Sequence, residues 1–290
     1  MSSGPKPEIN KGLFIATPAF GGNVSHEFVL SLLRLDRLCS KLGIPIGYQL
    51  IGNESLISRG RNYLADYFMQ SNLSHMIFID ADIQFEPDDI IRMFASDLPI
   101  IGGVYPKKRL HLDRKADSAL MCDYVVLPLE NTVIRDIMKP QPVRYVGTGL
   151  MMIQRDVLDK MREAFPNDWY WAEERQYYCY FDTQLKDGIY LSEDYYFCDR
   201  WRMLGGEVHA AFWTRCVHWG TYGFNGNLVN ANYSSMEKKP IIPQPNSSSP
   251  SPSPSPPIQT INPDQKKEIT KDIPLRSISS ASSAFPIFQV

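Results

Sequence analysis

The sequence has 290 residues, of which 43% are hydrophobic and 12% aromatic, so it can fold into one large α/β domain or two smaller ones. Its formal net charge of −2 excludes the strong basic field of a typical nucleic-acid-binding protein, and we expect no nucleic-acid partner. The polar, Pro-rich start and the lack of any run of ~18 apolar residues predict neither a signal peptide nor a membrane span. Five scattered cysteines without a C-x-x-C pair favour reduced thiols, which predicts a cytoplasmic location (the host cytoplasm if the chain is viral) and no zinc site.

Strand-like and helix-like segments alternate through the first hundred residues. In chain order, the expected elements are a strand at 12–16, a helix at 25–42, a strand at 46–51, a helix at 56–69, a strand at 76–79, a short helix at 87–94 and a strand at 98–104. Alternation of this kind indicates a mostly parallel, Rossmann-like sheet flanked by helices.

The first two helices each have an expected inward face. Ser25 suits the N-cap of the first helix. The apolar face of that helix is expected to consist of Phe28, Val29, Leu32, Leu33, Leu35 and Leu38. The second helix is expected to turn Ile57, Leu64 and Phe68 inward.

The pattern becomes irregular after residue 105. Short strands are expected at 124–127 and 150–153, and helices at 155–165 and 193–204; together they suggest a substrate-facing layer built on the first half. From residue 236 onward, serine and proline dominate, and such a segment buries too little apolar surface to offset its ordering entropy. We therefore expect a globular domain over residues 10–235 and a disordered Pro/Ser-rich tail over 236–290.

Two carboxylates follow the third expected strand at once. Met76 to Ile79 form an unbroken apolar run, typical of a strand buried on both faces, and Asp80 and Asp82 come directly after it. The carboxyl ends of strands in α/β sheets are where ligands bind. Oxygen ligands of this kind suit Mg²⁺ or Mn²⁺, commonly together with substrate phosphates. The alternative is a solvated turn in which the acids only cap the next helix.

Further segments accompany these acids in order along the chain. They are Ala16-Thr17-Pro18, Ser58-Arg59-Gly60-Arg61-Asn62, Gly102-Gly103-Val104-Tyr105-Pro106, Gly147-Thr148-Gly149, Glu193-Asp194-Tyr195-Tyr196-Phe197 and His218. With Asp80-Ala81-Asp82 as a D-x-D motif, residues 11–225 resemble the GT-A fold, nucleotide-sugar-dependent glycosyltransferases. In size and layout the chain is similar to the single-domain transferases of large DNA viruses.

The resemblance implies a function and a site. It implies transfer of a hexosyl or deoxyhexosyl group from a UDP- or GDP-sugar to a hydroxyl of a glycan or glycoprotein, in a GT-A fold with an acceptor-side half. Mn²⁺ or Mg²⁺ would be held by Asp82, His218 and Asp80. The nucleotide-sugar would be contacted by Thr17, Pro18, Arg59, Asn62, Asp80, Ala81, Asp82, Tyr105, Thr148 and Gly149.

Glu193 and Asp194 are the candidate catalytic acids. The acceptor hydroxyl must lose a proton, which a positioned carboxylate can take, and a helix N-terminus favours the ionised form. Between the two, the resemblance implies that Asp194, the second acid of the motif, is the base, and we expect inversion to be favoured over retention. The alternative for both acids is ordinary capping of the helix that they open.

Other readings stay open. A phosphotransferase or phosphatase could use Asp80 as a nucleophile, and an inactive sugar-binding module is the non-enzyme alternative. His218 could be structural, and Arg59 and Arg61 could bind diphosphate or lie on a solvated helix face. The run from Lys107 to Arg109 favours a solvated loop over a phosphate contact.

Overall fold

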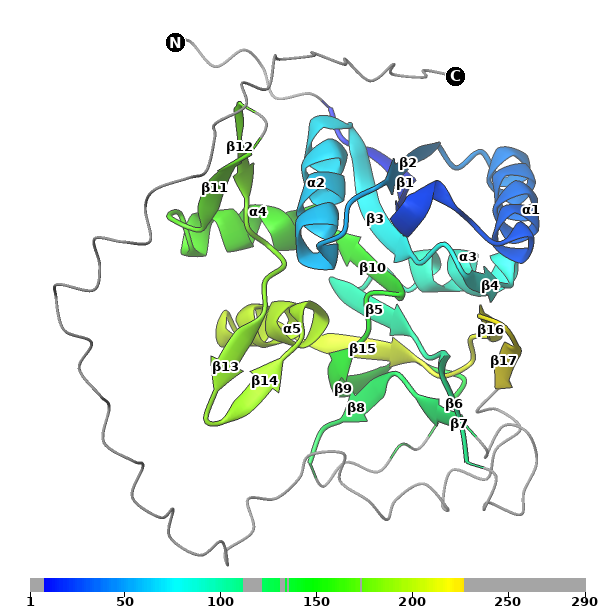
Figure 1. The fold of residues 1–290 in the computed structure, drawn as a ribbon. Coiled ribbons are helices and arrows are strands. Elements are labelled where there is room, and N and C mark those ends of the chain that lie inside the picture. The colour runs from blue at the N-terminus through cyan, green and yellow to red at the C-terminus, as the bar shows by residue number, and fades with distance from the viewer. Residues whose placement is uncertain (1–7, 112–121, 131–133, 135, 173, 227–290) are drawn as a thin grey trace, which may run out of the picture. The chain divides into compact units, whose positions relative to one another are not determined.

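A mixed eight-stranded sheet forms the centre of the fold (Figure 1). The computed structural model describes residues 8–111, 122–130, 134, 136–172 and 174–226. The strand order is β2-β1-β3-β10-β5-β15-β9-β8, and β9 and β10 run opposite to the other six strands. The strands are β1 (Asn10–Ala19), β2 (Ile46–Gly52), β3 (Leu73–Ile79), β5 (Ile100–Gly103), β8 (Val126–Pro128), β9 (Gln141–Val146), β10 (Leu150–Gln154) and β15 (Val208–Ala211).

Helices cover both faces of this sheet (Figure 1). They are α1 (His26–Leu42), α2 (Ile57–Gln70), α3 (Pro87–Ala95), α4 (Arg155–Ala164) and α5 (Glu193–Met203). One apolar layer includes Leu64 of α2, Leu158 of α4 and Phe197 of α5, and the other includes Phe28 of α1 and Ile90 of α3. The predicted α/β class, with a mostly parallel sheet flanked by helices, is confirmed.

β3 is buried on both faces, as its apolar run predicts. Met76 and Phe78 point into the layer under α2, and Ile77 and Ile79 point into the layer under α1. All four side chains are fully buried. The strand therefore leads from the core directly to the acids that follow it.

Shorter elements surround the end of β3. A three-stranded sheet has the order β17 (Gly223–Gly226), β16 (Cys216–Trp219), β4 (Ile83–Phe85). β6 (Pro106–Leu110) pairs with β7 (Cys122–Tyr124), and a 3-10 turn, η1, spans Phe20–Gly22. Two hairpins complete the described part, namely β11 (Trp169–Ala172) with β12 (Arg175–Tyr178), and β13 (Gln184–Lys186) with β14 (Ile189–Leu191).

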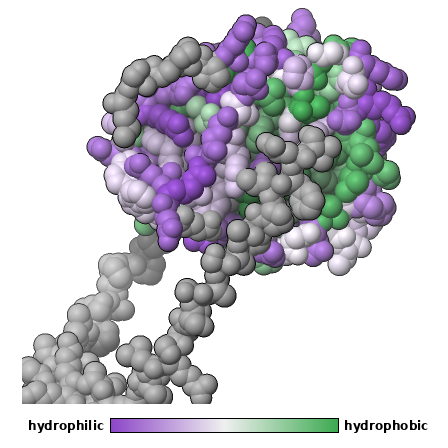
Figure 2. Space-filling view, turned by 90° about the horizontal axis from the view of Figure 1, so that it is seen from above, coloured by the Kyte–Doolittle hydropathy of each residue, from purple (hydrophilic) through white to green (hydrophobic). Residues whose placement is uncertain are grey.

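The N-cap of α1 is confirmed, but its predicted apolar face needs correction. The Ser25 hydroxyl accepts a hydrogen bond from the backbone N–H of Phe28 at 3.2 Å. Val29 and Leu33 are exposed, whereas Ser31 is fully buried. Apolar side chains also reach the surface in Figure 2, so hydrophobicity alone did not identify the buried stripe.

The inward face of α2 also differs from the prediction. Ile57 is exposed, and the buried side chains include Arg61 and Asn62. The first turns of α2 lie beside the polar end of β3, where hydrogen-bonding partners replace apolar contacts. The sequence pattern could not show this, because burial of a charge depends on partners from distant segments.

The expected layering of the two halves of the chain also needs correction. β8, β9, β10 and β15 all come from the second half of the chain, yet they belong to the central sheet, and β10 lies between β3 and β5. The insertion is antiparallel, with Met151 opposite Phe78. The predicted tail, residues 236–290, lies outside the described residues. In the described part of the chain, no helix is long and apolar enough to cross a membrane.

Candidate active site

Asp80, the first of the two acids after β3, is held by a backbone hydrogen bond to a neighbouring turn. The N–H of Asp80 donates to the carbonyl of Gly149 at 2.9 Å, and the carbonyl of Asp80 accepts from Ile83 at 3.0 Å. Gly149 belongs to the turn between β9 and β10. The antiparallel pairing of β10 with β3 thus brings the segment at 147–149 to the carboxyl end of β3.

A buried arginine joins Asp80 to the acid pair at the start of α5. The Arg61 Nη2 group donates to Asp80 Oδ1 at 3.0 Å, and Nε donates to Glu193 Oε1 at 3.3 Å. Only 3% of the Arg61 side chain is exposed. Burial lowers the pKa of Arg61, but the charges of Asp80 and Glu193 outweigh it and raise the pKa above its ordinary value. The guanidinium is therefore a fixed positive charge between two carboxylates.

The same network includes the turn between β9 and β10. The Thr148 hydroxyl donates to Glu193 Oε1 at 3.3 Å, and Thr148 itself is buried. Residues from α2, the end of β3, the β9–β10 turn and α5 meet here. Four predicted segments that are far apart in the sequence therefore form one site.

Tyr105 packs against the two glycines of that turn. The N–H of Gly149 donates to the Tyr105 hydroxyl at 3.1 Å. A Cβ atom on Gly149 would lie 2.5 Å from the Tyr105 hydroxyl oxygen and 3.0 Å from Asp80 Oδ2, and one on Gly147 would lie 2.6 Å from the same hydroxyl. Glycine at both positions allows this close approach. Burial raises the pKa of Tyr105 well above its ordinary value, so its hydroxyl stays neutral.

Asp82 lies in a second cluster, with His218 and Lys108. His218 Nε2 is 3.4 Å from Asp82 Oδ1, and the Lys108 ammonium contacts Asp82 Oδ2. The other ring nitrogen of His218, Nδ1, lies 3.0 Å from the carbonyl oxygen of Pro106, to which it can donate. Burial raises the pKa of Asp82, but the hydrogen bonds with His218 and Lys108 outweigh it and hold the pKa below its ordinary value.

Asp194 has the most perturbed carboxyl group of the site. Its Oδ1 accepts from the Tyr195 N–H at 2.8 Å and from the Ser192 hydroxyl. Burial and the neighbouring charge of Glu193 raise the pKa of Asp194 to about 6. A carboxyl group in this range can exchange a proton near neutral pH, as a general base must.

Two other residues that were predicted to contact the nucleotide-sugar are bonded to other parts of the protein. Arg59 is exposed and forms an ion pair with Glu54, with Nε 2.7 Å from Oε2. Both ends of the Asn62 amide are bonded to the backbone of Phe181, at 2.8 and 2.9 Å. Their contact with a nucleotide stays a prediction.

Three further residues that were predicted to contact the nucleotide-sugar lie within or beside the segment Asp80-Ala81-Asp82. Ala81 accepts a hydrogen bond through its carbonyl from the N–H of Ser25 at 2.8 Å. Thr17 is fully buried at the end of β1, and within the described residues its hydroxyl has no hydrogen-bond partner. Pro18 is half-buried beside it.

The predicted metal ligands do not assemble as a set of three. Asp80 faces Arg61, and among the described residues no group of three or more His, Cys, Asp or Glu side chains could hold a metal ion. Asp82 and His218 nevertheless offer an oxygen and a nitrogen, and the Pro106 carbonyl orients the imidazole as is usual for a metal ligand. The Lys108 ammonium already places a cation on this carboxylate. The pair therefore fits a divalent cation that takes its other ligands from phosphates and water.

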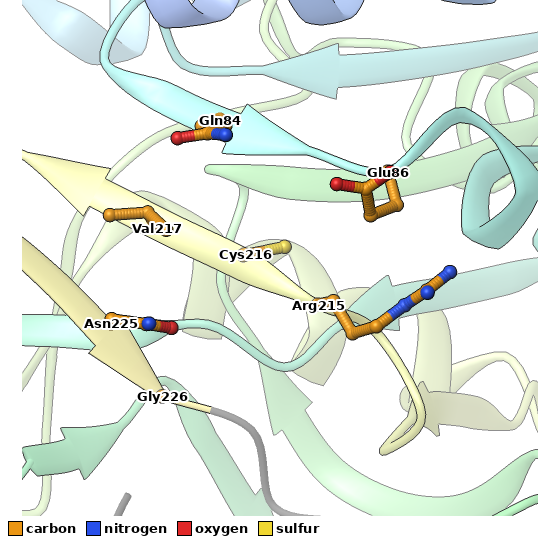
Figure 3. Close-up of a pocket in the computed structure, with 7 residues that line it drawn as sticks. All are labelled: Gln84, Glu86, Arg215, Cys216, Val217, Asn225 and Gly226. Atoms are coloured by element: carbon orange, nitrogen blue, oxygen red, sulfur yellow. The ribbon is translucent and has the colours of Figure 1, made fainter. Parts of the chain in front are cut away.

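A pocket of about 300 Å³ lies along β4, β16 and β17, and its lining includes neither Asp82 nor His218. Figure 3 shows its lining residues, which are Gln84, Glu86, Arg215, Cys216, Val217, Asn225 and Gly226. The Arg215 guanidinium is bonded to both oxygens of Asp89, at 3.0 and 3.1 Å, so its charge is compensated.

The comparisons with known proteins reach only weak similarity. No protein-family model matches the sequence, and no curated protein matches it. A solved protein from STIV is 16% identical, with a TM-score of 0.46, over 72% of this chain and 86% of its own. A glycosyltransferase involved in the glycosylation of the major capsid of PBCV-1 is 13% identical, with a TM-score of 0.29, over 54% and 68%. The inositol-1-phosphate CTP transferase from T. maritima is 15% identical, with a TM-score of 0.33, over 70% and 85%. Similarities of this size assign neither a family nor an activity.

Proposed function

We propose that the protein is a glycosyltransferase of the GT-A type, which moves a sugar from a nucleoside diphosphate-sugar to an acceptor hydroxyl with the help of a divalent cation. The observation that carries the proposal is the Arg61 bridge. It joins the acid motif after the central strand to the acid pair that opens α5, at 3.0 and 3.3 Å. This link supports an arrangement in which the leaving group binds on the side of Asp80 and the acceptor on the side of Glu193.

The two acidic clusters supply different chemistry. Asp82 and His218 would hold Mn²⁺ or Mg²⁺, which stabilises the negative charge of a leaving diphosphate when it is bound. Asp194 takes the proton of the acceptor hydroxyl, and its raised pKa suits this task. Glu193 is held by Arg61 and Thr148, so its role is to orient the reacting sugar. A single base beside the acceptor favours inversion at the anomeric carbon.

The rival enzyme class uses Asp80 as a nucleophile. Nucleophilic attack needs a carboxylate oxygen that is free to reach phosphorus. Asp80 Oδ1 accepts from a buried guanidinium, and a Cβ on Gly149 would lie only 3.0 Å from Oδ2, so backbone closely approaches the second oxygen. These contacts favour a positioning role for Asp80 over a covalent one.

Product analysis separates the classes. We would incubate the protein with a panel of UDP- and GDP-sugars and Mn²⁺, and record both the melting temperature and the released nucleotide. A bound donor raises the melting temperature, and transfer or hydrolysis releases nucleoside diphosphate. Release of phosphate from a phosphoester, or of pyrophosphate from a nucleoside triphosphate, would contradict the proposal. Donor binding without any turnover would support an inactive sugar-binding module instead.

Chelation should abolish transfer. If Asp82 and His218 hold the cation, excess EDTA removes activity and Mn²⁺ or Mg²⁺ restores it. Asp82→Asn should lower the rate more than Asp80→Asn, because Asp82 alone would bind the cation directly. Asp80→Asn should instead lower the melting temperature, since Arg61 loses one of its two charged partners. Full activity in EDTA would rule out the cation.

The rate should depend on the ionisation of Asp194. Because its pKa lies at about 6 in the protein without substrates, kcat/KM should fall about tenfold per pH unit below that value and reach a plateau above it. The measurement is kcat/KM for the acceptor between about pH 4.5 and pH 8, which spans this pKa and the ordinary one. A flat profile across this range would show that another group takes the proton.

A further inference from the structure

The Lys108 ammonium contacts the carboxylate of Asp82, to which the proposed divalent cation would bind. Lys108 lies on β6, and its ammonium contacts Asp82 Oδ2, while His218 of β16 lies 3.4 Å from Oδ1. The loop after β3, β6 and β16 therefore meet at one carboxylate. The ammonium neutralises this carboxylate in the protein alone.

An ammonium and a divalent cation cannot both be accommodated on one carboxylate without cost. A single and a double positive charge about 5 Å apart repel each other even at the dielectric constant of water, and more strongly in a partly buried site. The divalent cation therefore binds more weakly while the ammonium stays on Asp82. Binding of the divalent cation therefore favours departure of Lys108 from Asp82.

Lys108 is able to leave. About 36% of its side chain is exposed, and so is 39% of the Asp82 side chain. Ion pairs at such exposure contribute little to stability, and the four-carbon stem of lysine is flexible. The stem passes close to Gly220, where a Cβ atom would lie 3.5 Å from Lys108 Cδ, so no bulky side chain encloses it there.

We propose that Lys108 is the resident counter-ion of Asp82 and competes with the divalent cation for this carboxylate. This inference rests on the cation site of the proposed function. The cation then binds weakly to the protein alone. An anionic diphosphate that accepts the released ammonium strengthens cation binding, and by thermodynamic reciprocity the cation strengthens binding of the anion. Lys108 thus makes the two ligands bind together rather than separately.

Mn²⁺ affinity tests the competition without any transfer assay. Binding of Mn²⁺ alone would be measured by calorimetry, or by the loss of the free-ion electron paramagnetic resonance signal. Lys108→Met should bind Mn²⁺ up to about fivefold more tightly than the wild type, because the cation no longer has to displace the ammonium from Asp82. Lys107→Met is the matched control, since it removes the same charge from the neighbouring position of β6. Lys108→Arg, which keeps a cation, should stay near the wild-type affinity.

The outcomes distinguish the inference from the function on which it rests. Equal Mn²⁺ affinity in Lys108→Met and Lys107→Met, with Asp82→Asn having lost binding, would overturn the role of Lys108 alone. Unchanged Mn²⁺ binding in Asp82→Asn, or no binding by any variant, would overturn the cation site itself. Tighter binding in Lys108→Met only, together with loss in Asp82→Asn, would support the competition.

Discussion

Asp194→Asn should lower turnover by about 10²-fold or more while leaving donor affinity unchanged. Asparagine keeps the size of aspartate and an oxygen that can accept from the Tyr195 N–H, which lies 2.8 Å from Asp194 Oδ1. It removes the basic site that would take the acceptor proton. The measurement is release of nucleoside diphosphate at saturating substrates, with donor binding followed separately by calorimetry.

The same substitution should stabilise the protein above pH 6. The pKa of Asp194 in the folded state, about 6, lies above its ordinary value, so ionisation is harder in the folded chain than in the unfolded chain. Stability is therefore lost as the pH rises from about 4 to about 6, and Asn removes this loss. The melting temperature of Asp194→Asn should exceed that of the wild type at pH 8, and the difference should shrink toward pH 4. Lower activity with higher stability is expected of a catalytic group held in an unfavourable environment.

Glu193→Gln serves as the comparison for this prediction. Glu193 Oε1 accepts from Arg61 and Thr148, and a Gln oxygen can keep both contacts. Its effect on turnover should accordingly be milder. If Glu193→Gln reduced turnover more than Asp194→Asn, the roles of the two acids would be reversed. Loss of donor binding in Asp194→Asn would assign that residue to the donor pocket.

The sequence was most informative where a pattern has one physical solution. An apolar run such as Met76 to Ile79 can be satisfied only by burial on both faces, and β3 is buried on both faces. Ser25 before an amphipathic segment has one good use, and its hydroxyl does cap α1. Local chemistry determined these features, so they could be read from single segments.

Pairing between distant segments could not be read in the same way. β10 lies between β3 and β5 in the sheet. This place depends on its two neighbours, so it cannot be read from residues 150–154 alone. Exposure of Leu33 on α1 has the same origin, because only the assembled fold decides which apolar residues are covered.

In the candidate site, too, some residues could be identified from a single segment, whereas others depend on contacts between distant segments. The acids at Asp80, Asp82, Glu193 and Asp194 were found from their positions at ends of elements. The importance of Arg61 and the contact of Lys108 were not, since a basic residue on a helix or strand most often lies on a solvated face. A useful signal for Arg61 was available, because it lies one helical turn before the apolar residues Leu64 and Ala65, which are fully buried.

Arg61→Met should destabilise the fold by about 3–5 kcal/mol. Methionine fills much of the same volume, but it leaves Asp80 and Glu193 without their shared positive partner, and removing one member of a buried charge network is costly. The free energy of unfolding from urea titration at pH 7.5 measures the effect.

Arg59→Met is the control on the same helix. Arg59 is exposed, and its ion pair with Glu54, although only 2.7 Å long, lies at the surface, so its loss should cost less than about 1 kcal/mol. Equal effects of the two substitutions would show that Arg61 contributes no more than a surface ion pair. A large effect of Arg61→Met alone has a further consequence for catalysis. Because the guanidinium is the direct link between the acid motif after β3 and the acid pair of α5, the relative position of these two groups depends on one buried charge.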